Sequence, residues 1–144
     1  MGQESAPFAN HGTVLLDFDG TIADTGSYIL RCAHRALLEC GYPEEAEGDL
    51  RCLIGPPLFN GFSDLCHKPL QEGERITAVF RRLFDEEMSP DYYPVFPGMR
   101  ELIAALHGQG RQVAVATSRL ETTACQMIDS LDLPPFDAIV GRLE

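Results

Sequence analysis

Short, nearly continuous apolar runs alternate along the chain with longer stretches in which apolar residues recur at helical spacing. The short runs cover residues 13–18, 112–116 and 136–140. Because each run is brief and is followed by polar or glycine residues, it is typical of a buried strand in a parallel sheet. Between the first two runs the spacing is helical, which predicts helices and no strand there.

The same pattern predicts the order of the elements. Helices are expected at 27–40, about 57–66, 72–88, from Pro97-Gly98 to Gly108, and at 121–131, with an acidic connector at 44–48 and a proline-rich loop at 50–58. The order strand, helical insert, helix, strand, helix, strand predicts an α/β fold with a parallel sheet and right-handed crossovers. We therefore expect a core made of residues 13–24 and 95–144 and a helical domain at 25–94.

Composition narrows the function. The chain has 144 residues, 44% of them hydrophobic, and a net charge of −11, which is typical of a soluble globular protein and argues against a nucleic-acid partner. No apolar run reaches 18 residues and the first 12 residues lack a basic region, so neither a membrane span nor a signal peptide is expected. Five scattered cysteines without a CxxC motif predict reduced thiols in a cytoplasmic protein.

Two carboxylates mark the end of the first predicted strand. Asp17 and Asp19, in the segment DFDGT, are two positions apart, and such residues point to the same side of an extended chain. Gly20 permits a sharp turn, and the Thr21 hydroxyl and nearby N–H groups could donate to an anion. Two ionised carboxylates this close favour a cation between them, and their hard oxygens suit Mg²⁺. The segment therefore predicts a magnesium site in which Asp17 attacks phosphorus and Asp19 transfers protons.

The segment DFDGTIADT resembles motif I of the haloacid dehalogenase-like (HAD) phosphatases, in particular the phosphoglycolate phosphatase and β-phosphoglucomutase branch. The order of elements resembles that family too, whose helical type C1 cap is inserted directly after motif I. The resemblance implies a Rossmann-like core that hydrolyses phosphate monoesters of small metabolites through an aspartyl-phosphate. It also implies that Asp17 and Asp19 are the catalytic and Mg²⁺-binding residues, with Gly20 and Thr21 beside the phosphate.

The segment VAVATSR resembles motif II of the same family, with Thr117 as the matching residue. Ligands of parallel sheets bind at the carboxyl ends of strands, so the Thr117 hydroxyl and the N–H of Ser118 or Arg119 are expected to hold a phosphoryl oxygen. Two alternatives stay open: Ser118 is only a helix cap, and Arg119 either reaches a phosphate or lies in solvent.

The segment IGPPL resembles the specificity loop of the cap, which implies that Gly55, Pro56 and Pro57 close over the substrate. The alternative is an ordinary proline-rich connection between helices.

The family's later motifs have no counterpart in this sequence. They comprise a lysine after the third strand and acidic residues after a fourth, whereas the one lysine, Lys68, falls in the helical region. The chain thus resembles the amino-terminal two-thirds of a phosphatase, truncated at its carboxyl end, and we expect it to hydrolyse phosphate monoesters weakly or not at all by itself. A phosphomutase, a phosphonate hydrolase using Lys68 and a non-catalytic remnant with a phosphate pocket stay open. An exposed edge of the first strand predicts pairing with a second copy or with a missing segment.

Overall fold

The computed structural model describes residues 12–143, which form two compact units. The sheet unit contains the described residues up to Asp24 together with those from Pro94 onward, and the helical unit comprises Thr25–Tyr93. The two chain segments that enter and leave the helical unit pair within the sheet unit: the Asp24 N–H donates to the Pro94 carbonyl (2.8 Å), and the Phe96 N–H donates to the Ile22 carbonyl (3.0 Å). Each unit is described by itself below.

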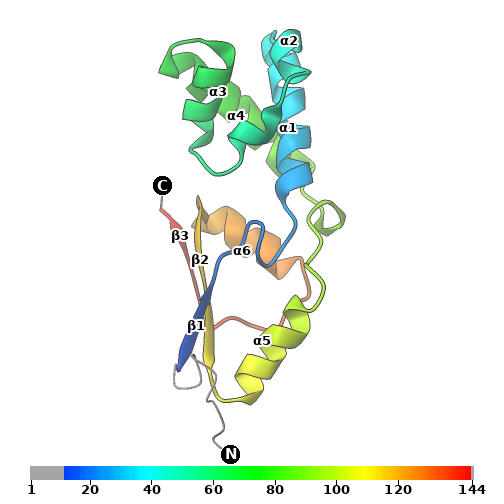
Figure 1. The fold of residues 1–144 in the computed structure, drawn as a ribbon, viewed down its shortest axis with the longest axis vertical. Helices are drawn as coiled ribbons and strands as arrows, with labels where there is room; N and C mark the ends of the chain where they lie inside the picture. Colours follow the sequence, from blue (N-terminus) through cyan, green and yellow to red (C-terminus); the bar gives the residue numbers. More distant parts are fainter. Residues whose placement is uncertain (1–11, 144) are drawn as a thin grey trace, which may run out of the picture. The chain divides into compact units, whose positions relative to one another are not determined.

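The sheet unit is a parallel sheet in the order β1-β2-β3 (Figure 1). Its strands and helices are β1 (Thr13–Leu16), α5 (Met99–Gly108), β2 (Gln112–Leu120), α6 (Glu121–Asp129) and β3 (Ala138–Arg142). This arrangement confirms the predicted parallel α/β core, and β1 lies at one edge of the described sheet.

The two faces of this sheet differ in burial. Residues alternate between faces along a strand, and Val113 and Val115 are buried on the face where α5 and α6 pack. On the opposite face, Ala114 in the central strand is buried, but its partner in register, Leu15, is 67% exposed and Val140 is 59% exposed. Parallel sheets are usually covered on both faces. The described residues therefore leave one apolar face, as well as the β1 edge, in contact with solvent.

The strand boundaries differ from the predicted ones. β1 ends at Leu16 rather than Phe18, because the chain turns into a loop after Asp17. β2 continues to Leu120 rather than ending at Ala116, since it resumes pairing with β3 after an irregular stretch. β3 is shifted towards the carboxyl end relative to the predicted run at 136–140.

The helical unit lies between β1 and β2 in the sequence, and the described residues contain no strand there. Its elements are α1 (Gly26–Cys40), α2 (Pro43–Ala46), η1 (Leu50–Leu53), α3 (Leu58–Cys66), α4 (Leu70–Glu86) and η2 (Pro90–Tyr92). The predicted helical insert is confirmed, with two differences: the expected acidic connector forms the short helix α2, and the proline-rich loop begins with the single 3₁₀ turn η1. Pro43 at the start of α2 fits the first helical turn, where its missing N–H costs nothing.

Helices α3 and α4 pack closely because one position on α4 has no side chain. A Cβ added to Gly73 would lie 2.0 Å from the Phe59 carbonyl oxygen and 3.0 Å from the Ser63 nitrogen, both in the backbone of α3. The closely packed pair buries Phe62 and Phe80, whose ring centroids are 6.2 Å apart. Glycine is therefore required at this crossing for steric reasons.

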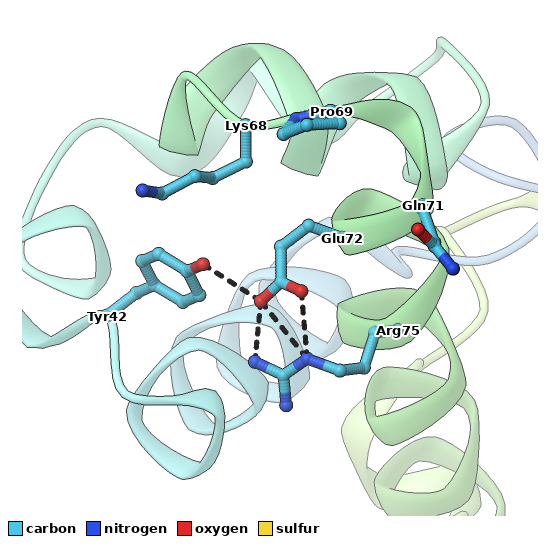
Figure 2. Close-up of a pocket in the computed structure, with 6 residues that line it drawn as sticks. All are labelled: Tyr42, Lys68, Pro69, Gln71, Glu72 and Arg75. Atoms are coloured by element: carbon cyan, nitrogen blue, oxygen red, sulfur yellow. Dashed lines mark hydrogen bonds and ion pairs between the residues drawn. The ribbon is translucent and has the colours of Figure 1, made fainter.

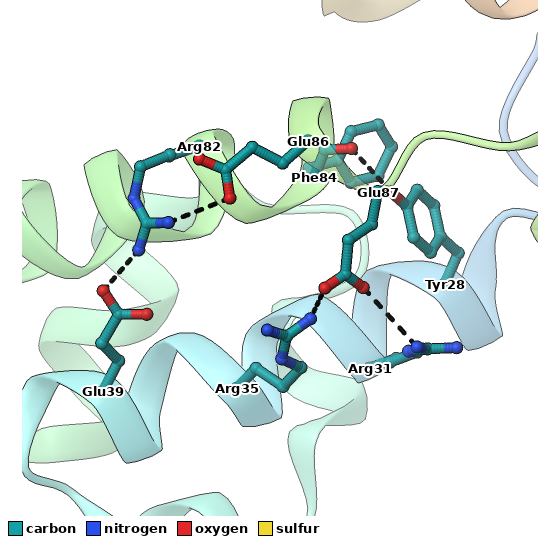
Figure 3. A network of polar contacts seen from close by, with 8 residues as sticks. All are labelled: Tyr28, Arg31, Arg35, Glu39, Arg82, Phe84, Glu86 and Glu87. Carbon is teal, nitrogen blue, oxygen red and sulfur yellow. Dashed lines mark hydrogen bonds and ion pairs between the residues drawn. The ribbon is translucent and has the colours of Figure 1, made fainter.

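Polar contacts join α1 to the end of α4 (Figure 3). The buried Tyr28 hydroxyl donates to the Phe84 carbonyl at 2.6 Å, and burial raises the pKa of this phenol. The Glu87 carboxylate forms an ion pair with Arg35, and its Oε2 lies 3.6 Å from Nη2 of Arg31. Arg31 precedes Arg35 by one turn of α1. The tyrosine bond and the ion pairs fix the register between the two helices.

A second cluster of polar side chains, formed by Tyr42, Glu72 and Arg75, lines a surface pocket beside α2 and α4 (Figure 2). Arg75 donates to Glu72 from Nε and Nη2, and the Tyr42 hydroxyl donates to the same carboxylate at 2.8 Å. The hydrogen bonds from the Arg75 guanidinium have the larger effect and that from the Tyr42 phenol the smaller. Together they lower the pKa of Glu72 to about 2.

Glu72→Gln is expected to lower stability at neutral pH and to make little difference in acid. The folded-state pKa of Glu72 lies below its ordinary value of 4.5, so its contribution is complete above pH 4.5 and is lost as pH falls towards 2. Urea unfolding of both proteins at pH 7, 4 and 2 measures the difference. Glu74→Gln, an exposed position on the same helix, is the control. A Glu72→Gln deficit that is the same at all three pH values would contradict the assignment.

Two further features concern residues 12–143 as a whole. All five cysteines are free thiols, and burial raises the pKa of Cys66 to about 11, so it is a poor nucleophile at neutral pH. Within residues 12–143, no helix is both long enough and apolar enough to cross a membrane.

Candidate active site

The loop that follows β1 is a tight turn organised by one carbonyl. The Phe18 oxygen accepts hydrogen bonds from the N–H groups of Thr21, Ile22 and Ala23 at 3.0–3.3 Å, and the Gly20 N–H donates to the Ala23 carbonyl at 2.9 Å. Gly20 adopts φ 75°, a left-handed conformation that glycine takes without strain. Phe18, Ile22 and Ala23 are fully buried, so the loop is anchored in the core of the sheet unit.

This turn has a consequence for anion binding. The N–H groups of Gly20 and Thr21 both donate inside the loop, so in this conformation neither is directed at a ligand. The Thr21 hydroxyl remains the donor that this part of the loop could offer. The left-handed backbone conformation at position 20 is sufficient to explain why this residue is glycine.

The two carboxylates of the loop lie in different surroundings. Asp17 directly follows β1 and is exposed, and its Oδ1 accepts a hydrogen bond from the Phe18 N–H at 2.8 Å. Asp19 is half-buried, with 28% of its side chain exposed. The loop therefore presents one carboxylate to solvent and turns the other towards the rest of the sheet unit.

The partner of Asp19 is Arg119, which lies 100 positions later in the sequence. Arg119 Nη2 donates to Oδ1 at 2.6 Å and Nε donates to Oδ2 at 3.1 Å, a two-point contact between guanidinium and carboxylate. Only 14% of the Arg119 side chain is exposed. Of the two alternatives left open by the sequence, the reading in which Arg119 lies in solvent is wrong.

This ion pair brings the two predicted motifs together. The parallel register aligns Leu16 with Val115, so Asp17 and the residues after it lie beside the last part of β2. In that part, the Thr117 hydroxyl oxygen accepts a hydrogen bond from the Arg119 N–H at 3.1 Å, and Thr117 is half-buried. Ser118 is exposed and belongs to the irregular end of β2, not to the first turn of α6.

The end of β3 supports the same segment. A Cβ on Gly141 would lie 2.8 Å from the Arg119 carbonyl oxygen, and the Gly141 N–H donates to Glu121 Oε2 at 3.0 Å. Glu121 was not singled out from the sequence, and nothing in its local pattern distinguishes it from an ordinary first-turn acid. Its contact helps to fix the backbone from which Arg119 projects.

The predicted specificity loop belongs to the helical unit. Gly55, Pro56 and Pro57 lie between η1 and α3, and all three are exposed. Gly55 has φ 109°, so this turn needs glycine. The three residues do not line the pocket shown in Figure 2, which includes Lys68 and Arg75.

Of the two carboxylates in the loop after β1, Asp17 is the one that a divalent cation can reach. Asp17 is exposed, whereas both oxygens of Asp19 are bonded to Arg119. Within residues 12–143 no group of three or more His, Cys, Asp or Glu side chains is placed to surround a metal ion. Mg²⁺ commonly binds through one or two carboxylates together with water and substrate phosphate, and Asp17 fits that role.

The chain is similar in sequence to known proteins. Residues 14–144 match the family described as haloacid dehalogenase-like hydrolase. A probable phosphatase, IndB, of Dickeya dadantii is 36% identical over 89% of this chain and 57% of that protein. A phosphoglycolate phosphatase of Caulobacter vibrioides is 27% identical over 92% of this chain and 58% of its own length.

A solved structure is similar in fold. The crystal structure of a predicted phosphatase from Clostridium acetobutylicum superposes with a TM-score of 0.79 at 26% identity, over 92% of this chain and 62% of that one. The chain thus spans about 60% of the length of these relatives. From the match over residues 14–144 and the parallel α/β unit interrupted by helices after β1, this chain belongs to the haloacid dehalogenase-like hydrolase family.

Proposed function

We propose that the chain carries the nucleophile and the proton-transfer group of a magnesium-dependent phosphatase acting on small phosphorylated metabolites. The observation that carries the proposal is the placement of two carboxylates, Asp17 and Asp19, on the hydrogen-bonded loop after β1, with Asp19 in contact with the end of β2. Ligands of parallel α/β sheets bind at this end of the strands. The similarity to proteins named as phosphatases supports the same reaction class.

Asp17 is the proposed nucleophile because it is the exposed carboxylate of the pair. In the first step, its free oxygen forms a bond to phosphorus as the bond from phosphorus to the ester oxygen breaks, and Asp19, which must have left Arg119 and taken up a proton beforehand, protonates the leaving oxygen. In the second step, Asp19 takes a proton from water, the water oxygen forms a bond to phosphorus as the bond from phosphorus to the Asp17 oxygen breaks, and inorganic phosphate leaves. Both carboxylates then return to their starting forms.

Phosphoryl oxygens would be held by donors around this loop. The proposed donors are the hydroxyls of Thr117, Ser118 and Thr21. Gly20 is proposed to let the phosphate approach the backbone closely, because it has no side chain. Thr117 is the best supported of these, because its hydroxyl lies at the end of the strand next to β1 and is already ordered by the Arg119 N–H. A bound Mg²⁺ would neutralise charge shared by Asp17 and the phosphoryl group.

The helical unit is proposed as the cap that selects the substrate. The loop containing Gly55, Pro56 and Pro57 is exposed and shaped by a left-handed glycine, as expected for a segment that contacts a ligand. The uncovered edge of β1 and the apolar face around Leu15 and Val140 are proposed to be covered by further polypeptide, either a second copy of this chain or additional HAD core.

The proposal predicts that beryllofluoride, which mimics a phosphoryl group on an aspartate, binds to the chain only when Mg²⁺ is present. ¹⁹F NMR of the chain with beryllium and fluoride should show a bound resonance with MgCl₂ and none with EDTA. Excess inorganic phosphate should weaken the signal by competing for the Thr117 donors. Absence of a bound resonance at saturating Mg²⁺ would instead favour the non-catalytic remnant.

A further inference from the structure

Arg119 holds Asp19 in an arrangement that the proposed reaction cannot use. Its Nη2 donates to Asp19 Oδ1 at 2.6 Å and its Nε donates to Oδ2 at 3.1 Å, so each carboxylate oxygen already has a charged partner. While this two-point contact lasts, Asp19 cannot offer an oxygen or a proton to a ligand. A competing partner for the guanidinium is therefore needed before Asp19 can take part.

The ion pair lies where a phosphoryl group is proposed to bind. Asp19 shares its loop with Asp17, and Arg119 follows Thr117 by two positions at the end of β2. The Arg119 N–H donates to the Thr117 hydroxyl oxygen at 3.1 Å. The ion pairs between α1 and the end of α4 hold two helices in register (Figure 3), whereas this pair joins the loop of the proposed nucleophile to the proposed phosphate donors.

A phosphoryl group is the competitor that suits a guanidinium held in this way. The forked N–H donors bind phosphate oxygens in the same two-point manner as carboxylate oxygens, and a phosphate monoester carries more negative charge than a carboxylate at neutral pH. A phosphate bound near Asp17 would also be repelled by both loop carboxylates unless a cation joined it. Transfer of the guanidinium from Asp19 to the phosphate supplies that cation.

The Arg119 side chain can make this move on a fixed backbone. The backbone is held by the Thr117 hydroxyl and by the close approach of Gly141, where a Cβ would lie 2.8 Å from the Arg119 carbonyl oxygen. The Arg119 side chain is 14% exposed and that of Asp19 is 28% exposed, so the contact can be reached from solvent. Rotation about the side-chain torsions of arginine then carries the guanidinium from one partner to the other.

We propose that Arg119 is a phosphate-binding residue, and that the arriving phosphoryl group takes its guanidinium away from Asp19. The inference rests on the proposed function, because it assigns a trigger to that same site. In the empty site the ion pair keeps Asp19 occupied, and in the filled site Arg119 binds phosphoryl oxygens beside Thr117. Asp19 is released only when a ligand with a terminal phosphate group is present.

The direct test follows the guanidinium itself. Inorganic phosphate is the probe, and Mg²⁺ is left out so that binding does not depend on the metal. The Nε–Hε resonance of Arg119, identified by its loss in Arg119→Lys, is followed by NMR as phosphate is added to the 144-residue chain. It should shift to a limit together with the amide resonances of Thr117 and Ser118. Arg119→Gln should lower phosphate affinity about tenfold, which corresponds to about 1.4 kcal/mol.

Asp19→Asn tests the competition. Asparagine holds the guanidinium less strongly than aspartate does, so phosphate should bind about tenfold more tightly. Asp24→Asn, at an exposed position of the sheet unit, removes the same charge and should change the affinity by less than about twofold. In the Arg119→Gln background, Asp19→Asn should also give less than about a twofold gain, because no guanidinium is left to release.

The inference is overturned if phosphate does not bind, if it shifts only resonances of the helical unit, or if saturating phosphate leaves the Arg119 Nε–Hε resonance in place. An about tenfold gain from Asp19→Asn that survives in the Arg119→Gln background would also overturn it, since that gain would be a charge effect. If Arg119→Gln does not fold, the resonance titrations of the wild type and of Asp19→Asn decide the matter.

Failure of the proposed function looks different from failure of this inference. If the proposed function fails, Asp17→Asn is still phosphorylated by acetyl phosphate, whereas Arg119 still leaves Asp19 when phosphate binds. If only the inference fails, labelling depends on Asp17 and the Arg119 resonance does not respond to phosphate.

Discussion

Asp17→Asn is expected to abolish covalent phosphorylation of the chain, reducing labelling by at least about 10³-fold. The amide is neutral and is a poor nucleophile, so no bond to phosphorus forms. The surrounding loop should be unaffected, because Asp17 is exposed and an asparagine side-chain oxygen can still accept the hydrogen bond from the Phe18 N–H. The measurement is acid-stable, hydroxylamine-sensitive label after incubation with radioactive acetyl phosphate and MgCl₂.

Two aspartates of the same region serve as controls. Asp24→Asn changes an exposed carboxylate seven positions later and should label like wild type. Asp19→Ala keeps the nucleophile but removes the proton donor and acceptor, so both formation and hydrolysis of the label should be slower. Label persisting at the wild-type level in Asp17→Asn would place the nucleophile elsewhere.

Gly73→Ala is expected to destabilise the helical unit by about 3 kcal/mol. The new Cβ would lie 2.0 Å from the Phe59 carbonyl oxygen and 3.1 Å from its carbon, and helix backbone cannot move aside as a side chain can. Helices α3 and α4 would have to separate, exposing part of the buried Phe62 and Phe80 rings. The better helix propensity of alanine offsets this by only about 1 kcal/mol.

The measurement is the urea midpoint followed by far-ultraviolet circular dichroism. Gly108→Ala, at the end of α5, is the matched control, because a Cβ there meets nothing within 4 Å. That variant should be as stable as wild type or slightly more stable, by up to about 1 kcal/mol. If Gly73→Ala unfolds at the wild-type urea concentration, the close crossing of α3 and α4 is not real.

Much of the fold was predictable because it depends on local pattern. A continuous apolar run such as 112–116 can be buried only in a strand or a helix, and its short length with flanking glycine favours a strand. The helical insert is predictable from the spacing of apolar residues, because a 3.6-residue period is visible in the sequence whichever elements the helix packs against. The boundaries were less accurate: β2 extends to Leu120 because its last residue pairs with Arg142, a tertiary contact.

Local sequence patterns predict the alternation of strands and helices, the insertion after the first strand and the acidic pair at the proposed phosphoryl site, because each involves residues that are close together in the chain. The tertiary structure decided which of these groups meet. Arg119 and Asp19 are 100 positions apart, and Gly73 has no local sign of the α3 backbone beside it. Such relations arise only when register and helix packing bring distant segments together, so no local pattern encodes them.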